Sequence, residues 1–357
     1  MDNFHAVSRY EACLILGAVG DALGFNNGRW EFQRSGEIIH NEVKELGGVE
    51  KLDLRNFRVS DDTVMAMATA RALLQADSNI TSDYLFPIIT QQYIECMKDM
   101  SERAPGNCVT ATLRNIEKGQ VQNGYQVPFN GRGGGCGAAM RAVPIGLRFP
   151  RSEQYKDLIR VAVESGRITH HHPTGYMGSV AVALFTSLAI RRVPTDEWGM
   201  ILLNSIKDVK SFIIKSEHEV QLNLRHMVTF EKKWRNYLME RNLLNGGTVV
   251  FPAKYGVKER DTFYHSLNSS GWGGCTGIDA PMIAYDALLF ARDNWILLCE
   301  SGMLHGGDSD STGILAGSWF GLLYGLDGIP FAHYDYIEKK NELITLSKQL
   351  SKYYFSS

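Results

Sequence analysis

The chain has 357 residues, 44% of them hydrophobic and 21% charged, which is the composition of an ordinary soluble globular enzyme. Its formal net charge of −2 gives no electrostatic case for binding nucleic acid or a membrane surface. The six scattered cysteines form no CxxC pair, so we expect free thiols and a reducing, cytoplasmic location.

The N-terminal segment predicts a helix over residues 5–24, followed by a loop. Asp21 lies in this helix among glycine and apolar residues, so we expect a buried carboxylate that binds neighbouring backbone groups. In the loop, Glu31 stands between Trp30 and Phe32. A glutamate in that position is either a gating or acid/base residue or an ordinary solvated side chain, and its immediate neighbours favour neither interpretation.

The next two helices are a short one over residues 36–47 and one that begins at the cluster Ser60-Asp61-Asp62-Thr63. Ser60 is a suitable N-cap, and the carboxylates of Asp61 and Asp62 would meet the positive end of the helix dipole. Residues 64–74, which follow, are nearly all good helix formers. Taken alone, the cluster is best interpreted as a well-capped helix start.

The central region is rich in glycine and proline over residues 101–135, and the glycines from Gly133 to Gly137 lead into a further helix. Backbone N–H groups in such a segment can bind a phosphate. The segment matches neither the Walker nor the Rossmann pattern, so a close-packed turn is an equal alternative. Phe129, just upstream, could stack on a base. A histidine of the triplet 170–172 more commonly caps a helix or packs in the core than takes part in catalysis. Of the three, His170 is the candidate for a ligand contact.

The rest of the pattern is helical, with one strand-like run at 248–251 and a second glycine-rich segment at 269–277. The apolar stretches 179–190 and 314–326 are too short or too glycine-rich to span a bilayer. We therefore predict an all-α bundle with one core, a single domain over residues 1–357, and a monomer. The further helices expected are about 81–100, 152–166, 174–191, 195–245, 282–290, 293–303, 312–325 and 337–353.

A second acidic cluster lies at 305–313, His-Gly-Gly-Asp-Ser-Asp-Ser-Thr-Gly, and again opens a helix. Asp308, Asp310 and Ser311 offer more oxygen atoms than one helix cap needs, and hard cations such as Mg²⁺ bind such oxygens. An EF-hand calcium loop is excluded because its twelfth position is Trp319 where a glutamate is required. A DxDxT phosphatase nucleophile should follow an apolar strand, and this cluster does not. The two acidic clusters together indicate the two halves of one two-metal site.

These motifs together resemble one family, the ADP-ribosylglycohydrolases of the dinitrogenase-reductase-activating glycohydrolase type. The resemblance covers nearly the whole chain, and the segments Arg58-Val59-Ser60 and Ser270–Gly274 resemble the ADP-ribosylarginine hydrolase branch in particular. It implies an all-α orthogonal bundle with two Mg²⁺ ions in a cleft. The segments that carry it are 20–24, 60–63, 134–141, 169–175 and 305–312.

The resemblance also implies roles for individual residues. Asp310 would bridge the two metal ions, and Glu31 would lie near the scissile bond with Asp61 and Asp62 as catalytic partners. The implied metal ligands are Ser60, Asp61, Asp62, Asp308, Asp310 and Ser311. The implied substrate contacts are Phe129, Gly134, Gly135, Cys136, Gly137, His170, Ser270, Gly271, Trp272, Gly273 and Gly274.

The function implied is Mg²⁺-dependent hydrolysis of the N-glycosidic bond between ADP-ribose and an arginine side chain of a modified protein. The partners would be ADP-ribosylated proteins and ADP-ribose itself. Two alternatives stay open. The same fold could cleave another linkage, to serine or in O-acetyl-ADP-ribose, or the protein could bind ADP-ribose without turnover. The intact acidic clusters argue against a protein that only binds.

Overall fold

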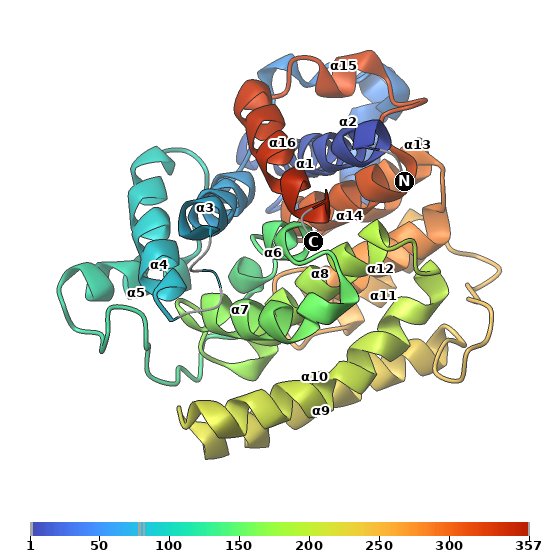
Figure 1. Cartoon of the computed structure of the whole chain (residues 1–357). Helices are drawn as coiled ribbons and strands as arrows, with labels where there is room; N and C mark the ends of the chain where they lie inside the picture. Colours follow the sequence, from blue (N-terminus) through green and yellow to red (C-terminus); the bar gives the residue numbers. More distant parts are fainter. Residues whose placement is uncertain (1–2, 78–79, 81–82, 356–357) are drawn as a thin grey trace.

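The computed structural model describes residues 3–77, 80 and 83–355 (Figure 1). Within these residues the regular backbone is helical, and β pairing is limited to isolated bridges such as Gly135 with Thr276. The all-α prediction is confirmed.

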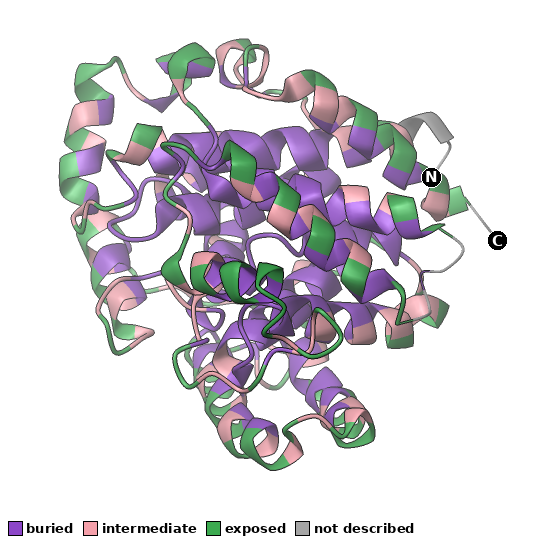
Figure 2. Cartoon of the chain, turned by 90° about the vertical axis from the view of Figure 1, so that its left-hand side faces the viewer, coloured by how far each residue is buried: buried purple, intermediate pink, exposed green. Residues whose placement is uncertain are grey.

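Two helices from opposite ends of the chain form the centre of the bundle. Helix α1 (Asn3–Phe25) packs along α14 (Ser309–Tyr324), and the buried residues gather in the helices around them (Figure 2). A Cβ atom at Gly20 would overlap the carbonyl oxygen of Gly313, and one at Gly24 would overlap the backbone of Ser309. The two backbones therefore touch, and only glycine permits this approach at the contact points.

The other helices surround this pair. Those that pack directly against it are α3 (Asp61–Ala76), α8 (Pro173–Ile190), α12 (Asp279–Ala291), α13 (Trp295–Gly302), α15 (Phe331–Tyr334) and α16 (Lys340–Phe355). The remaining helices are α2 (Gly36–Glu45), α4 (Leu85–Cys96), α5 (Asn107–Glu117), α6 (Val143–Arg148), α7 (Tyr155–Arg167), α9 (Trp198–Ser216), α10 (Val220–Glu240) and α11 (Val257–Ser266). Helices α9 and α10 lie side by side at the bottom of Figure 1.

Several local predictions were wrong. The strand-like run 248–251 is irregular, because no other strand in the described residues lies beside it to pair with. Helix α5 lies inside the region expected to be loop, and α11 was not expected. The glycine run leads only into a 3₁₀ turn, Cys136–Ala138, before α6. Residues 81 and 82, where the predicted helix 81–100 begins, lie outside the described residues.

Helix α8 is longer than the apolar stretch expected within it. Among the described helices it is the one whose length and composition would suit a membrane span, yet 94% of it is buried inside the molecule. Its burial against α6, α7 and α14 makes it a core helix.

Replacing Gly20 by alanine should destabilise the fold, because the new methyl group overlaps the α14 backbone and forces the central helices apart. We expect a loss of about 2 kcal/mol or more in the free energy of unfolding, measured by urea denaturation. Gly131→Ala is the matched control, since a Cβ atom there meets nothing within 4 Å, and its effect should stay within about 0.5 kcal/mol. Equal stability of the two variants would contradict the account of the helix contact.

Candidate active site

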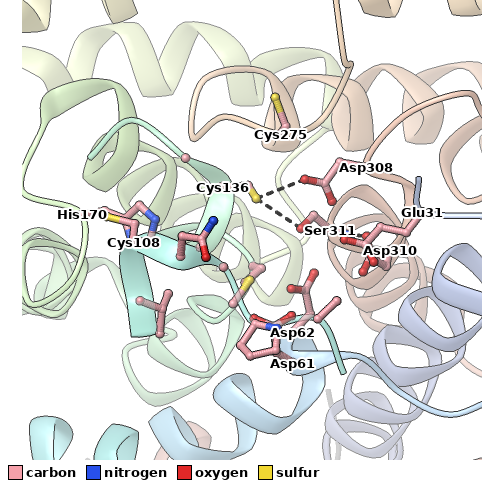
Figure 3. Close-up of a pocket in the computed structure, with 18 of the residues that line it drawn as sticks. Glu31, Asp61, Asp62, Cys108, Cys136, His170, Cys275, Asp308, Asp310 and Ser311 are labelled. Atoms are coloured by element: carbon pink, nitrogen blue, oxygen red, sulfur yellow. Dashed lines mark hydrogen bonds between the residues drawn. The ribbon is translucent and has the colours of Figure 1, made fainter. Parts of the chain in front are cut away.

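The acidic clusters meet in one cavity of about 390 Å³ (Figure 3). It lies where the loop after α1, the N-termini of α3 and α14, and the two glycine-rich segments converge. The polar side chains that line it include Glu31, Asp61, Asp62, Asp308, Asp310, Ser311, Asn107 and His170. The prediction that two distant acidic clusters face each other is therefore confirmed.

The first cluster is held in place by Asp21 from α1. Its carboxylate accepts hydrogen bonds from the backbone N–H groups of Ser60 and Thr63, each at 3.0 Å. Ser60 Oγ in turn accepts from the N–H of Asp62 at 3.1 Å, as expected of an N-cap. Asp21 thus has the supporting role predicted for it, and it fixes where α3 begins.

The second cluster is held by Asp261 from α11. Its carboxylate accepts from the N–H of Gly36 at 2.6 Å and from the N–H of Gly306 at 2.9 Å. This one side chain therefore joins the end of the Glu31 loop to the loop that precedes Asp308. In the sequence, Asp261 follows Lys258-Glu259-Arg260 and is indistinguishable from a solvated charge, so sequence analysis missed it.

Three carboxylates crowd together in the cavity. Glu31, Asp308 and Asp310 each offer an oxygen atom, and these atoms all lie within 4.8 Å of one another. Glu31 Oε2 and Asp62 Oδ2 are buried and have no hydrogen-bond partner. Glu31 is 8% exposed, so the interpretation as a solvated glutamate is wrong. Its place beside Asp308 and Asp310 also makes it a possible metal ligand, a role that the sequence did not suggest.

Burial and mutual repulsion change the acidity of these groups. Burial, followed by the charges of Asp308 and Asp61, raises the pKa of Glu31 to about 9. Burial and then Glu31 and Asp62 raise the pKa of Asp310. Burial also raises the pKa values of Asp61 and Asp62. A divalent cation would offset the negative charge of these carboxylates and could bind the oxygen atoms that have no hydrogen-bond partner. The residues present therefore fit a metal ion with oxygen ligands.

The two predicted hydroxyl ligands differ in position. Ser311 lines the cavity, and its Oγ donates to Cys136 Sγ at 3.5 Å. Ser60 is fully buried behind Asp62 and does not line the cavity. Its place among the metal ligands stays a prediction.

The two glycine-rich segments lie side by side, and both contribute to the wall of the cavity. The N–H of Cys136 donates to the carbonyl of Cys275 at 3.1 Å, and the N–H of Gly277 donates to the carbonyl of Gly134 at 3.2 Å. Asp279 holds the second segment by accepting from the N–H of Gly274 at 2.9 Å. Gly274 has φ of 96°, and a Cβ atom there would lie 2.7 Å from the carbonyl oxygen of Asp308. This segment therefore packs directly against the acidic motif.

Comparison with known proteins agrees with this arrangement. A sequence profile of the ADP-ribosylglycohydrolase family matches residues 3–356. The ADP-ribosylhydrolase ARH1 of Dictyostelium discoideum is 36% identical, with 95% of this chain and 92% of that protein covered. The chain belongs to the ADP-ribosylglycohydrolase family. The ADP-ribosylhydrolase ARH3 of Homo sapiens is a more distant relative, 22% identical over 99% of this chain and 95% of the human protein.

The fold of the family is also found among solved structures. An ADP-ribosylglycohydrolase-related protein complex superposes with a TM-score of 0.60 at 19% identity, over 98% of this chain and 99% of the other. As an ADP-ribosylglycohydrolase, the protein is a hydrolase of ADP-ribose linkages and acts on ADP-ribosylated substrates. The family is in general metal-dependent, and the acidic cluster of this member fits that property.

The cavity of this ADP-ribosylglycohydrolase contains only part of the predicted substrate contacts. Gly135, Cys136, Gly137, His170 and Trp272 line it. Gly134, Ser270, Gly271, Gly273 and Gly274 do not line it and form the supporting turns of the two segments. Residues 104–109 and Phe32 line it as well, although no motif in the sequence indicated a role for them. The loop-like composition of 101–135 concealed the start of α5 there.

Phe129 does not line the cavity. Its ring packs against His171, His172 and His226, with ring centroids 5.8, 5.2 and 5.4 Å away. It is therefore engaged in a histidine cluster, and its predicted contact with adenosine has no support in this geometry. His172 Nδ1 accepts from the N–H of Thr174, so His172 is the residue of the triplet that caps α8.

The neutral state of His171 should make stability depend on pH. Its Nδ1–H donates to the carbonyl of Val127 at 2.6 Å, and the amide of Asn223 donates to its Nε2 at 3.0 Å. Burial and then Arg167 lower the pKa of His171 to about 3. The unfolded chain takes up this proton below about pH 6.5, so stability falls as the pH drops below that value.

His171→Gln removes this titration and offers a similar donor and acceptor. Between pH 7 and pH 5 the wild type should lose about 2 kcal/mol more unfolding free energy than the variant. Urea denaturation at the two pH values measures this difference. Parallel losses in both proteins would show that His171 does not bind the proton on unfolding.

Proposed function

We propose that the protein is a Mg²⁺-dependent hydrolase that releases ADP-ribose from ADP-ribosylated arginine side chains of proteins by cleaving the N-glycosidic bond. The observation that carries the proposal is the meeting of Glu31, Asp61, Asp62, Asp308 and Asp310 in one cavity. The similarity to a relative named ARH1 over 95% of the chain supports this branch of the family.

In this proposal the aspartates at the N-termini of α3 and α14 would hold two metal ions, with Ser60 and Ser311 as further ligands. When bound, Mg²⁺ supplies positive charge that orients ribose hydroxyls and lowers the pKa of a water molecule. Asp310 offers an oxygen atom within 4.8 Å of those of Glu31 and Asp308, and the charge of Asp62 also raises the pKa of its carboxyl, so it is the candidate for a ligand shared by both ions.

The chain's own residues supply the rest of the chemistry. An aspartate of the pair Asp61 and Asp62 accepts the proton of the attacking water. Glu31, beside Asp308 and Asp310, orients the groups at the scissile bond. The leaving guanidine is a strong base and takes up a proton readily, so it needs less help from an acid than an alkoxide does. The backbone N–H groups of Gly135 and Gly137 bind the diphosphate, since that of Cys136 donates to the carbonyl of Cys275.

We also propose a cytoplasmic, monomeric enzyme. All six cysteines are free thiols, as predicted, and the reducing cytoplasm keeps thiols in that state.

The direct test is release of ADP-ribose from a matched pair of peptides, one modified on arginine and one on serine, with Mg²⁺ and with a chelator. We expect Mg²⁺-dependent release from the arginine-linked peptide. Release from the serine-linked peptide alone would assign the other linkage. Binding of ADP-ribose with no release from either peptide would identify a binding protein.

Asp310→Asn should reduce turnover by about 100-fold or more, because it removes an anionic ligand from the centre of the cluster. Without Mg²⁺ the variant should be at least as stable as the wild type, since one source of repulsion is gone, but Mg²⁺ should no longer raise its melting temperature. The matched control is Asp208→Asn on the exposed face of α9. Turnover near the wild-type level in Asp310→Asn would overturn the metal assignment.

A further inference from the structure

Two aromatic rings from different loops meet beside the acidic cavity. Phe32 follows Glu31 directly, and Trp272 lies in the second glycine-rich segment; both line the cavity. Their ring centroids are 6.0 Å apart with a tilt of 38°. Phe32 is 56% exposed, although it is a large apolar residue beside a buried glutamate. An aromatic side chain left exposed at the edge of a cavity is available to contact a ligand there.

The turn that carries Phe32 is held in place by the buried side chain of Trp30. Trp30 is buried, and its Nε1–H donates to Glu42 at 2.8 Å. The N–H of Gln33 donates back to the carbonyl of Trp30 at 2.9 Å and closes the turn. With Trp30 fixed in the core, Glu31 lines the cavity beside Asp308, and Phe32 lines it farther out.

Trp272 is held in a similar way. Its backbone N–H donates to Ser270 Oγ at 3.2 Å, and its carbonyl accepts from Asn268 at 2.8 Å. Asn268 also bonds to the buried carboxylate of Asp279. The indole Nε1–H is buried and has no partner in the protein, so a hydroxyl oxygen of the ribose joined to the guanidinium could accept from it. Hydrogen bonds therefore fix the backbone that carries each ring, so the two aromatic faces are preorganised for ligand binding.

The lining of the cavity indicates which part of the substrate these rings suit. None of the described residues that line it is lysine or arginine, so no cationic side chain of the lining competes for the aromatic faces. Metal ions would offset much of the charge of the five carboxylates, but aromatic faces attract planar cations by themselves, and guanidinium stacks on them. The glycosylated guanidinium of a modified arginine keeps its positive charge, whereas a serine linkage has none.

We propose that Phe32 and Trp272 form the subsite for the guanidinium of the substrate arginine and thereby set the preference for the arginine linkage. This inference rests on the proposed function. It assigns Trp272, one of the substrate contacts that the family resemblance implies, to the side of the leaving group. The residues contribute binding of the cation, while bond cleavage stays with the acidic cluster.

The variants Phe32→Leu and Trp272→Leu keep apolar bulk and remove the aromatic face, while Phe32→Tyr and Trp272→Phe keep the face. Each Leu variant should lower kcat/KM for the arginine-linked peptide by about 5- to 30-fold, mainly through a higher KM. The Tyr and Phe variants should stay close to the wild type. ADP-ribose affinity, measured by calorimetry, should be unchanged in all four.

A binding measurement separates this inference from the proposed function. With ADP-ribose and Mg²⁺ present, the wild type should bind methylguanidinium more tightly than the uncharged, similarly shaped methylurea, and the Leu variants should lose this preference. An unchanged KM in Phe32→Leu, with an active wild type, overturns the inference and leaves the function intact. Weaker ADP-ribose binding in the Leu variants overturns it as well, because the rings would then serve the nucleotide. A wild type that does not act on the arginine-linked peptide overturns the function itself.

Discussion

The structure depends on one contact between backbones, that of α1 with α14. Gly20 meets Gly313, and Gly24 meets Ser309, at distances that exclude any side chain. This contact brings the Glu31 loop, which follows α1, to the acidic motif that begins α14. It also places Asp21 where it can hold the start of α3. The spacing of the carboxylates in the cavity is therefore set by the closest approach that two helices can make.

The buried carboxylates in and around the cavity are of two kinds, and they differ in how their charge is satisfied. Asp21, Asp261 and Asp279 each accept hydrogen bonds from backbone N–H groups and fix the loops around the cavity. Glu31 and Asp62 keep an oxygen without a partner, and the carboxyl groups around them repel one another. Unpaired buried charge is unfavourable in a folded protein, so the braced loops supply the rigidity that keeps these groups together. The cost to stability is concentrated at the place where a cation can offset it.

Local patterns in the sequence predicted the helices, the cap at Ser60 and the two acidic helix starts, because each depends on neighbours along the chain. The bracing by Asp261 was not predictable, since its partner Gly36 lies 225 positions away and nothing near Asp261 distinguishes it from a surface charge. Helix α5 was missed although Val109, Leu113 and Ile116 have helical spacing, because the surrounding glycines and prolines dominated the pattern. Phe129 was assigned to the substrate because an aromatic ring beside a glycine run suits a base. Only the packing shows that histidines already occupy its surface.

The pairing of α1 with α14 also bears on how the protein is made. A ribosome produces α14 only about 280 residues after α1, so α1 must wait for its partner. Contacts of such long sequence separation form late and slow folding. Until then the face of α1 that is buried against α14 in the folded protein stays exposed, so it can form wrong contacts or bind chaperones. Since the cavity needs both helices, a chain released before α14 is made has no hydrolytic site, and activity begins only when α1 and α14 have packed together.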